Sequence, residues 1–105
     1  MSVYITVVRG QLKKADSLEE NQVAHNAIKA PLEALGKSLS PLGHRAYLNA
    51  ENPKEFLGID TWTTLEGPQR LFSDPRLAAE FERLFEQMPQ VSYWRASGWD
   101  SFSDV

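Results

Sequence analysis

The sequence of 105 residues predicts a single α+β domain with the element order β-α-β-β-α-β, a ferredoxin-like plan built on a four-stranded antiparallel sheet. Four short runs are rich in β-branched and aromatic residues, which is typical of strands. Two longer segments repeat apolar residues at steps of three and four, which is typical of helices packed on one side. The domain is expected to span residues 1–105, with a tail at 97–105 that could cross to a partner.

The predicted strands cover residues 3–9, 44–49, 56–62 and 91–96. A turn at Asn52-Pro53 joins the second strand to the third as a hairpin. Because side chains alternate along a strand, both faces of the first and third strands carry large apolar groups. Helices in this plan cover one face only. We therefore expect a second copy of the chain to cover the other, which predicts a homodimer.

The first helix is predicted over residues 17–38, opened by a capping box of Ser17 and Glu20. Pro31 should kink or split it, since proline cannot donate the helical hydrogen bond. Asn21 lies inside the apolar stripe of this helix and His25 at its edge, which is an unusual place for polar side chains.

A short helix and a longer one are predicted after the third strand. Thr63 and Glu66 form a capping box for the short one. Asp74 then caps the longer helix, with Pro75 at its first position and Pro89 at its end. Its apolar stripe consists of Leu77, Ala78, Phe81, Leu84, Phe85 and Met88.

Composition excludes several classes of function. The net charge of −3 disfavours nucleic acid as a partner, and the absence of cysteine removes disulfides, thiol nucleophiles and thiolate metal sites. No apolar run is long enough to cross a membrane, and no leader segment is evident, so a cytoplasmic location is expected. No motif for acyl transfer, nucleotide phosphates or dinucleotides occurs.

His25 is the first candidate catalytic residue. A histidine on a helix that faces a sheet can act as a general base, because its pKa lies near neutrality. Asn21, one turn earlier, could orient His25 or bind the same ligand. The alternative is a helix-edge histidine that only hydrogen-bonds a neighbour.

Asp60 is the second candidate, because a carboxylate in an apolar strand should be paired, protonated or functional. If its strand face points toward the helices, then His25, Asp60 and Trp62 converge on one pocket, with Asp60 as an orienting or second acid–base group. If that face points toward a partner, Asp60 forms an interface ion pair with Arg45 or Arg95 instead. The sequence leaves both possibilities open.

The remaining candidates are aromatic, apart from His44. Trp62, Tyr4 and Trp94 could line a pocket for a flat ligand, although core or interface packing is the alternative for each. His44 is interpreted as a simple strand-end residue. Two histidines and Asp60 lack the spacing of a metal motif, so no metal and no cofactor is predicted.

One pattern resembles a known family: a strand that ends in Trp runs into a helix start, then a Ser-Asp-Pro break and an amphipathic helix. The residues that carry it are Trp62, Thr63 to Glu66, Ser73 to Pro75 and Leu77 to Phe85. Together they resemble the dimeric α+β barrel superfamily, and within it the small antibiotic-biosynthesis-monooxygenase-like proteins. The resemblance implies a homodimer whose two sheets close into a barrel, with a ligand pocket between sheet and helices in each protomer.

In that group the pocket can host cofactor-free oxidation of aromatic polyketides, haem degradation or isomerisation of small molecules. Haem-degrading members need an Asn on the first strand and a His on the second helix, and this chain has neither. Many monooxygenase-like members carry a His before the break, and residues 70–72 contain none. The resemblance thus implies a small apolar or aromatic ligand, oxidised or isomerised without a cofactor; the alternative is a non-enzymatic dimerisation or ligand-sensing module.

Overall fold

The computed structural model describes residues 3–14 and 18–100. Its elements, in chain order, are β1 (Tyr4–Gln11), α1 (Leu18–Asn26), α2 (Lys29–Glu33), β2 (Gly43–Leu48), β3 (Glu55–Trp62), α3 (Glu66–Leu71), α4 (Pro75–Leu84) and β4 (Gln90–Arg95). The strands form one antiparallel sheet in the order β2-β3-β1-β4. This confirms the ferredoxin-like α+β plan, with each of its two helical segments divided in two.

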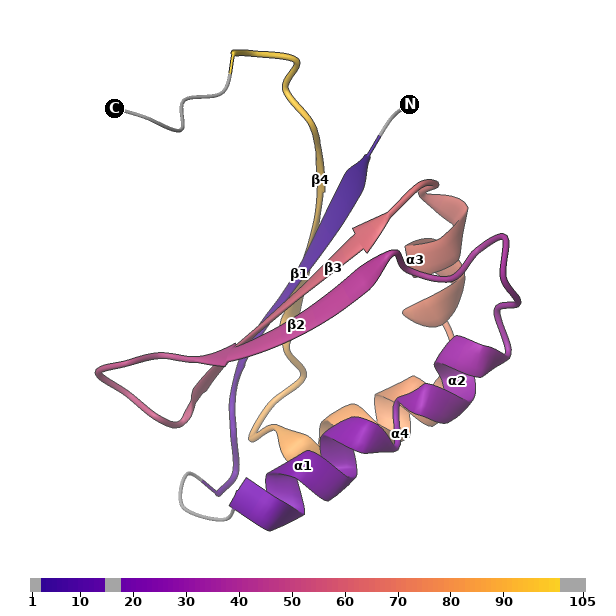
Figure 1. Ribbon diagram of the computed structural model, residues 1–105. Helices are drawn as coiled ribbons and strands as arrows, with labels where there is room; N and C mark the ends of the chain where they lie inside the picture. The colour runs from indigo at the N-terminus through magenta and orange to yellow at the C-terminus, as the bar shows by residue number, and fades with distance from the viewer. Residues whose placement is uncertain (1–2, 15–17, 101–105) are drawn as a thin grey trace.

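All four helices lie on the same side of the sheet (Figure 1). Strand β3 shows the arrangement most clearly, because buried and half-buried residues alternate along its whole length. Phe56, Gly58, Asp60 and Trp62 face the helices. The apolar core lies between this face and the helices, and consists of Val8, Leu12, Phe56, Trp62, Leu71, Leu77, Phe81, Leu84 and Phe85.

The first helical segment is shorter than predicted and is divided. Helix α1 ends at Asn26, and α2 begins at Lys29. Pro31 accounts for the division, because it cannot donate a hydrogen bond to the carbonyl of residue 27. After α2 the chain continues in turns, with Gly36 in a left-handed conformation (φ 79°) that favours glycine. The prediction of a helix through Ser38 was therefore wrong, and the Ser17 cap lies outside the described residues.

The Thr63 capping box was also wrong. Helix α3 begins at Glu66, and its N-cap residue, Leu65, makes no side-chain cap. The hydroxyl of Thr64 instead accepts a hydrogen bond from the Gly67 amide at 3.3 Å. Gly67 has to be small, since a Cβ atom there would lie 2.8 Å from the ring of Trp62.

Helix α4 begins as predicted and ends early. Asp74 is its N-cap and accepts a hydrogen bond from the Arg76 amide at 2.8 Å. The helix ends at Leu84 rather than near Pro89, because Phe85 becomes extended and bridges to Leu12. Met88, predicted in the apolar stripe, therefore lies beyond the helix and is exposed.

The helices leave the second face of the sheet uncovered within the described part of the chain, as predicted. Ile5, Tyr47 and Trp94 are 36%, 47% and 59% exposed there. Residues 96–100 extend away from the domain (Figure 1), and Trp99 among them is 84% exposed. None of the described helices has the length and apolar character needed to cross a bilayer.

Candidate functional site

A chain of polar side chains links α1 to the centre of the sheet. His25 on α1 approaches His44 on β2, with their Nε2 atoms 2.6 Å apart. The Nδ1 of His44 in turn pairs with a carboxylate oxygen of Asp60 on β3. Three elements that are distant in sequence therefore contribute one continuous hydrogen-bonded series, named here the polar chain.

The polar chain continues into the core. The second carboxylate oxygen of Asp60 accepts a hydrogen bond from the Thr6 hydroxyl at 3.4 Å, and Thr6 is fully buried. The same hydroxyl oxygen accepts a hydrogen bond from the indole N–H of Trp62 at 2.9 Å. Both ends of the carboxylate are thus satisfied, which is what a carboxylate buried in apolar surroundings requires.

The register of the sheet explains why these residues meet. The β2–β3 hairpin pairs His44 directly with Asp60, and the β1–β3 ladder pairs Thr6 with the same residue. Residues paired across an antiparallel ladder project from the same face, so all three side chains point toward the helices. Helix α1 then brings His25 over the β2 edge, where the two imidazole rings stack with centroids 4.8 Å apart.

The pKa values of the two histidines are shifted in opposite directions. The hydrogen bond to Asp60 raises the pKa of His44 above its usual value, against the effect of burial. Burial, followed by the nearby His44, lowers the pKa of His25. Only one proton fits between the two Nε2 atoms, so one ring donates to the other and both cannot be fully protonated in this contact. When the pair takes up one additional proton, the positive charge is therefore held preferentially on His44.

His25 also forms part of the wall of a cleft of about 390 Å³, named here the outer cleft. Its apolar walls come from β2, β3 and the end of α4, and its polar rim comes from α1. The residues that line it are Leu12, Asn21, Gln22, His25, Asn26, Ala46, Tyr47, Leu48, Phe56 and Leu84. The exposed end of the polar chain thus meets a cavity of ligand size.

The structure brings together some of the predicted site residues. His25 and Asn21 both line the outer cleft, and the Asn21 amide donates a hydrogen bond to the backbone oxygen of Lys14 at 2.6 Å. Asp60 lies behind His44 on the helix side of the sheet, so the alternative of an ion pair with Arg45 or Arg95 across an interface is not what the fold provides.

The three aromatic candidates lie elsewhere. Trp62 is 1% exposed and packs in the core, so it supports the polar chain from behind and does not form a ligand-facing wall. Tyr4 pairs with Trp62 across the sheet and packs against the same core. Trp94 lies on the uncovered face, where its indole N–H donates to the Ser92 hydroxyl at 2.8 Å. Neither Tyr4 nor Trp94 lines the outer cleft.

Sequence reasoning missed two members of the polar chain. His44 was interpreted as a strand-end residue, yet it connects His25 to Asp60. The sequence placed His44 on the same strand face as Ala46 and Leu48. Knowing the register of the β2–β3 hairpin would have been enough to pair it with Asp60. Thr6 gave no signal, because threonine is common in strands and only its burial shows the role.

The described residues contain no group of three side chains arranged to hold a metal ion. The two histidines and Asp60 hydrogen-bond one another, so their nitrogen and oxygen atoms do not converge on a common point.

The fold and the site together define a small α+β protein with a polar chain that opens on an apolar cleft. Among solved structures, the chain is similar to SnoaB, a cofactor-independent oxygenase from Streptomyces nogalater, with a TM-score of 0.66, 12% identity and coverage of 99% of this chain and 100% of that one. A provisionally assigned antibiotic biosynthesis monooxygenase from Bordetella bronchiseptica matches with a TM-score of 0.68, 9% identity and coverage of 90% and 96%.

A conserved protein from Methanosarcina mazei also matches, with a TM-score of 0.62, 16% identity and coverage of 90% and 92%. No family model matches the sequence, and no curated protein does. The predicted resemblance to the antibiotic-biosynthesis-monooxygenase-like proteins is thus confirmed for the fold, which this chain shares with them.

Proposed function

We propose that this protein is a homodimeric, monooxygenase-like protein that binds a small apolar or aromatic molecule in the outer cleft and removes a proton from it without a cofactor. The observation that carries the proposal is the polar chain, which runs from the cleft wall at His25 to the buried carboxylate of Asp60. A base backed by a second histidine and a carboxylate is a recurrent means of accepting a proton at neutral pH.

The walls of the cleft select the ligand. Leu12, Leu48, Phe56 and Leu84 offer apolar surface, and none of the described residues that line the cleft is a lysine, arginine, aspartate or glutamate. An ionic ligand would therefore be desolvated without a compensating charge. Asparagine and glutamine side chains of α1 at the rim can hydrogen-bond a carbonyl or hydroxyl group. A neutral ligand with an apolar body and one polar, acidic position fits these features.

The geometry supports a two-step proton path. When the proton between the rings belongs to His25, its Nδ1 carries no proton and can take one from the ligand, and the new N–H then donates to the Oδ1 of Asn26 on the cleft rim, 3.4 Å away. The Nε2 proton of His25 then passes to His44, 2.6 Å away, which becomes the cationic partner of Asp60. The opposite pKa shifts of the two histidines favour this direction of transfer.

The ligand anion formed in this way has two uses that need no cofactor. In an isomerisation the proton returns to a different atom of the ligand. In an oxidation the anion of an activated methylene reacts with dioxygen, so that the CH₂ group becomes C=O and the second oxygen atom leaves as water. The similarity in fold to a cofactor-independent oxygenase supports the second use.

The first test uses 4-nitrophenol, which absorbs visible light only when ionised, and 4-nitroanisole, which cannot ionise. We expect both compounds to raise the melting temperature, because a ligand that binds the folded state stabilises it. Bound 4-nitrophenol should show the phenolate band at pH 6. If neither compound stabilises the protein, or if bound nitrophenol remains neutral, the proposed function is wrong.

The homodimer is supported by the uncovered face of the sheet, where Ile5, Val7, Leu57 and Ile59 lie beside the exposed rings of Tyr47 and Trp94. Apolar patches of this kind on a soluble domain usually mark an interface. Residues 101–105, the last of the tail that could cross to a partner, lie outside the described part of the chain.

Ile59→Lys is expected to convert the dimer to a monomer, because it places a charge at the centre of the uncovered face. Size-exclusion chromatography with light scattering at micromolar concentration measures this. The matched control is Gln69→Lys on α3, an exposed site on the helix side that adds the same charge. A wild-type protein that is monomeric at this concentration would contradict the dimer.

A non-enzymatic ligand-sensing or dimerisation module is the alternative. The complete hydrogen bonding of Asp60 favours it, since the polar chain would then serve only to hold α1 on the sheet. Stabilisation by 4-nitroanisole together with neutral bound 4-nitrophenol would indicate this module.

A further inference from the structure

Helix α1 lies at the periphery of the domain beside α4 (Figure 1), and none of its described residues belongs to the buried core. The core residues come from β1, β3, α3, α4 and the residues that directly follow β1 and α4. Among the described side chains of α1, Asn21, Ala24 and His25 are half-buried and the others are exposed. Burial of apolar surface is the main source of helix stability in a folded protein, so α1 is held less firmly than α4.

Polar contacts attach α1 at two places. Near its start, the Asn21 amide donates to the Lys14 backbone oxygen, and the Lys14 ammonium pairs with Glu20 at 2.6 Å. The side chains of this ion pair are 62% and 63% exposed, so the pair contributes little to stability. Near its end, His25 meets His44 on β2. Within the described part of the chain, this contact is the only hydrogen bond between a side chain of α1 and a strand.

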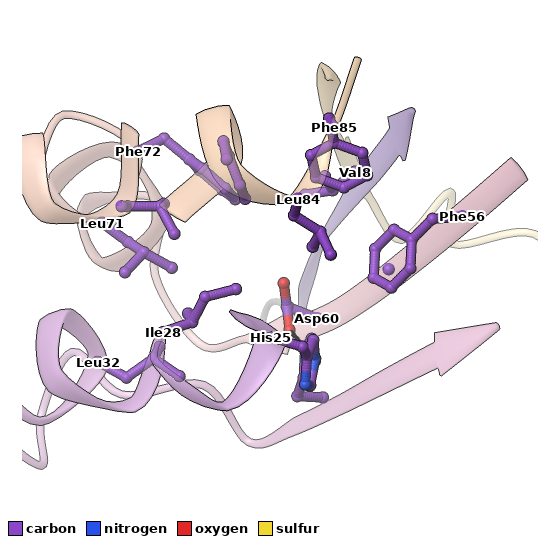
Figure 2. Close-up of a pocket in the computed structure, with 14 residues that line it drawn as sticks. Val8, His25, Ile28, Leu32, Phe56, Asp60, Leu71, Phe72, Leu84 and Phe85 are labelled. Atoms are coloured by element: carbon purple, nitrogen blue, oxygen red, sulfur yellow. Dashed lines mark hydrogen bonds and ion pairs between the residues drawn. The ribbon is translucent and has the colours of Figure 1, made fainter. Parts of the chain in front are cut away.

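The contact between His25 and His44 requires at least one neutral ring. Its two Nε2 atoms are 2.6 Å apart, so one must donate a hydrogen bond and the other must accept it. When both rings are cationic, two N–H groups and two positive charges face each other instead. Asp60 offsets the charge of His44, with which it is hydrogen-bonded. The carboxylate borders the same apolar pocket as the His25 ring (Figure 2) but makes no hydrogen bond to that ring. A second positive charge on the pair therefore opposes the contact.

His25 consequently binds a proton more tightly when α1 is away from the sheet. In the closed position, burial and then the neighbouring His44 lower the pKa of His25, and Lys29 on α2 acts in the same direction. Asp60 on β3 acts in the opposite direction without restoring the usual pKa. The side chains that line the outer cleft from the other elements are uncharged. A solvated imidazole has a pKa of about 6.5. Because protons prefer the open position, a fall in pH shifts the population toward it.

We propose that the contact between His25 and His44 is a pH-sensitive latch, which holds α1 over the outer cleft near neutral pH and releases it in acid. The cleft lies between the polar rim on α1 and the apolar walls on β2, β3 and α4. When α1 moves away from β2, these walls separate and the cleft opens to its ligand. The turn at residues 27–28, between α1 and α2, is one of the two ends about which α1 moves. The latch requires only the two rings, so it does not depend on the proposed reaction.

The test is hydrogen–deuterium exchange of the backbone amides in the full chain between about pH 5 and pH 8, with each rate divided by that of an unstructured peptide at the same pH. This ratio gives the fraction of molecules in which the amide is open. We expect the amides of residues 22–26 on α1 to be open roughly tenfold more often, or more, than those of residues 79–84 on α4. Below about pH 6.5 the opening of α1 should increase by up to about tenfold per pH unit, because one proton is taken up on opening.

His25→Gln tests the origin of the pH dependence. Glutamine does not titrate, and its side-chain amide can donate to a neutral His44 or accept from a cationic one. We expect the increase in α1 opening below about pH 6.5 to disappear in this variant. The matched control is Val23→His, which adds a titratable ring to α1 at a position that is 71% exposed and does not line the outer cleft. This control should keep the wild-type pH dependence.

Equal opening of α1 and α4 at every pH in the wild-type protein would overturn the latch, because α1 would then exchange only when the whole domain unfolds. So would an opening of α1 that does not change over this pH range, or a pH dependence that persists in His25→Gln. None of these measurements involves a ligand. The failure of the latch and the failure of 4-nitrophenol to ionise in the outer cleft are therefore separate results, and either can occur without the other.

Discussion

The His25→Ala protein is expected to exchange the acidic C–H protons of a bound ketone roughly 100- to 10,000-fold more slowly than the wild-type protein, which is the usual contribution of a general base. His25 is the member of the polar chain that lies on the cleft wall, and no other described residue there can accept a proton near neutral pH. The measurement is hydrogen–deuterium exchange of 2-tetralone, followed by NMR, which reports proton removal without any oxidation.

Val23→Ala is the matched control for this experiment. Val23 lies on the same helix, is 71% exposed and does not line the outer cleft, so its truncation should not alter the exchange rate. The dimer should persist in both variants, since α1 lies on the helix side of the sheet. If His25→Ala exchanged these protons at the wild-type rate, His25 would not be the base.

The Asp60→Asn protein is expected to lose about 2 kcal/mol of unfolding free energy at pH 6, the typical value of a hydrogen bond to a charged group. The pH dependence should change as well. Because the pKa of His44 is raised in the folded state, its contribution is fully present below the unfolded pKa of about 6.5 and is lost as the pH rises through the raised value. With asparagine at position 60, this loss on the alkaline side should disappear.

The dependence of stability on pH below neutrality should be different. The pKa of His25 is lowered in the folded state, so the unfolded chain takes up a proton first and stability decreases as the pH falls below about 6.5. That decrease should remain in Asp60→Asn. Urea unfolding at pH 5.5, 6.5 and 8.5 measures both sides. Asp74→Asn at the α4 cap is the matched control, and an alkaline loss in Asp60→Asn equal to that of the wild-type protein would contradict the pairing.

Most of the fold could be predicted from the sequence because local patterns determine it. The alternation in residues 56–62 and the Asp74-Pro75 start of α4 are short-range features, and the structure confirms both. The ends of the helices were less predictable. Helix α4 stops where Phe85 pairs with Leu12. The residues around Phe85 do not indicate this contact, because Leu12 is distant in the sequence.

The candidate site was only partly predictable for the same reason. His25 and Asp60 were recognised because each is a polar residue in an apolar pattern. His44 was not, since its role depends on the register of one hairpin and on where α1 lies over the sheet. For the aromatic residues, the sequence suggested a role in a ligand pocket that the structure does not give them. Trp62 and Trp94 look alike in sequence, and only the tertiary structure places one in the core and the other on the uncovered face.

Strand β3 alternates between two environments over its whole length, with Asp60 toward the helices and Ile59 toward the uncovered face. The proposed proton path and the proposed dimer interface therefore involve the same strand, at alternate positions along it. A one-residue insertion near its start would exchange the two sets, so that the carboxylate would point away from His44 and an isoleucine toward it. A substitution on one face of β3 would therefore affect only one of the two proposed roles, whereas a change in the length of the strand would affect both at once.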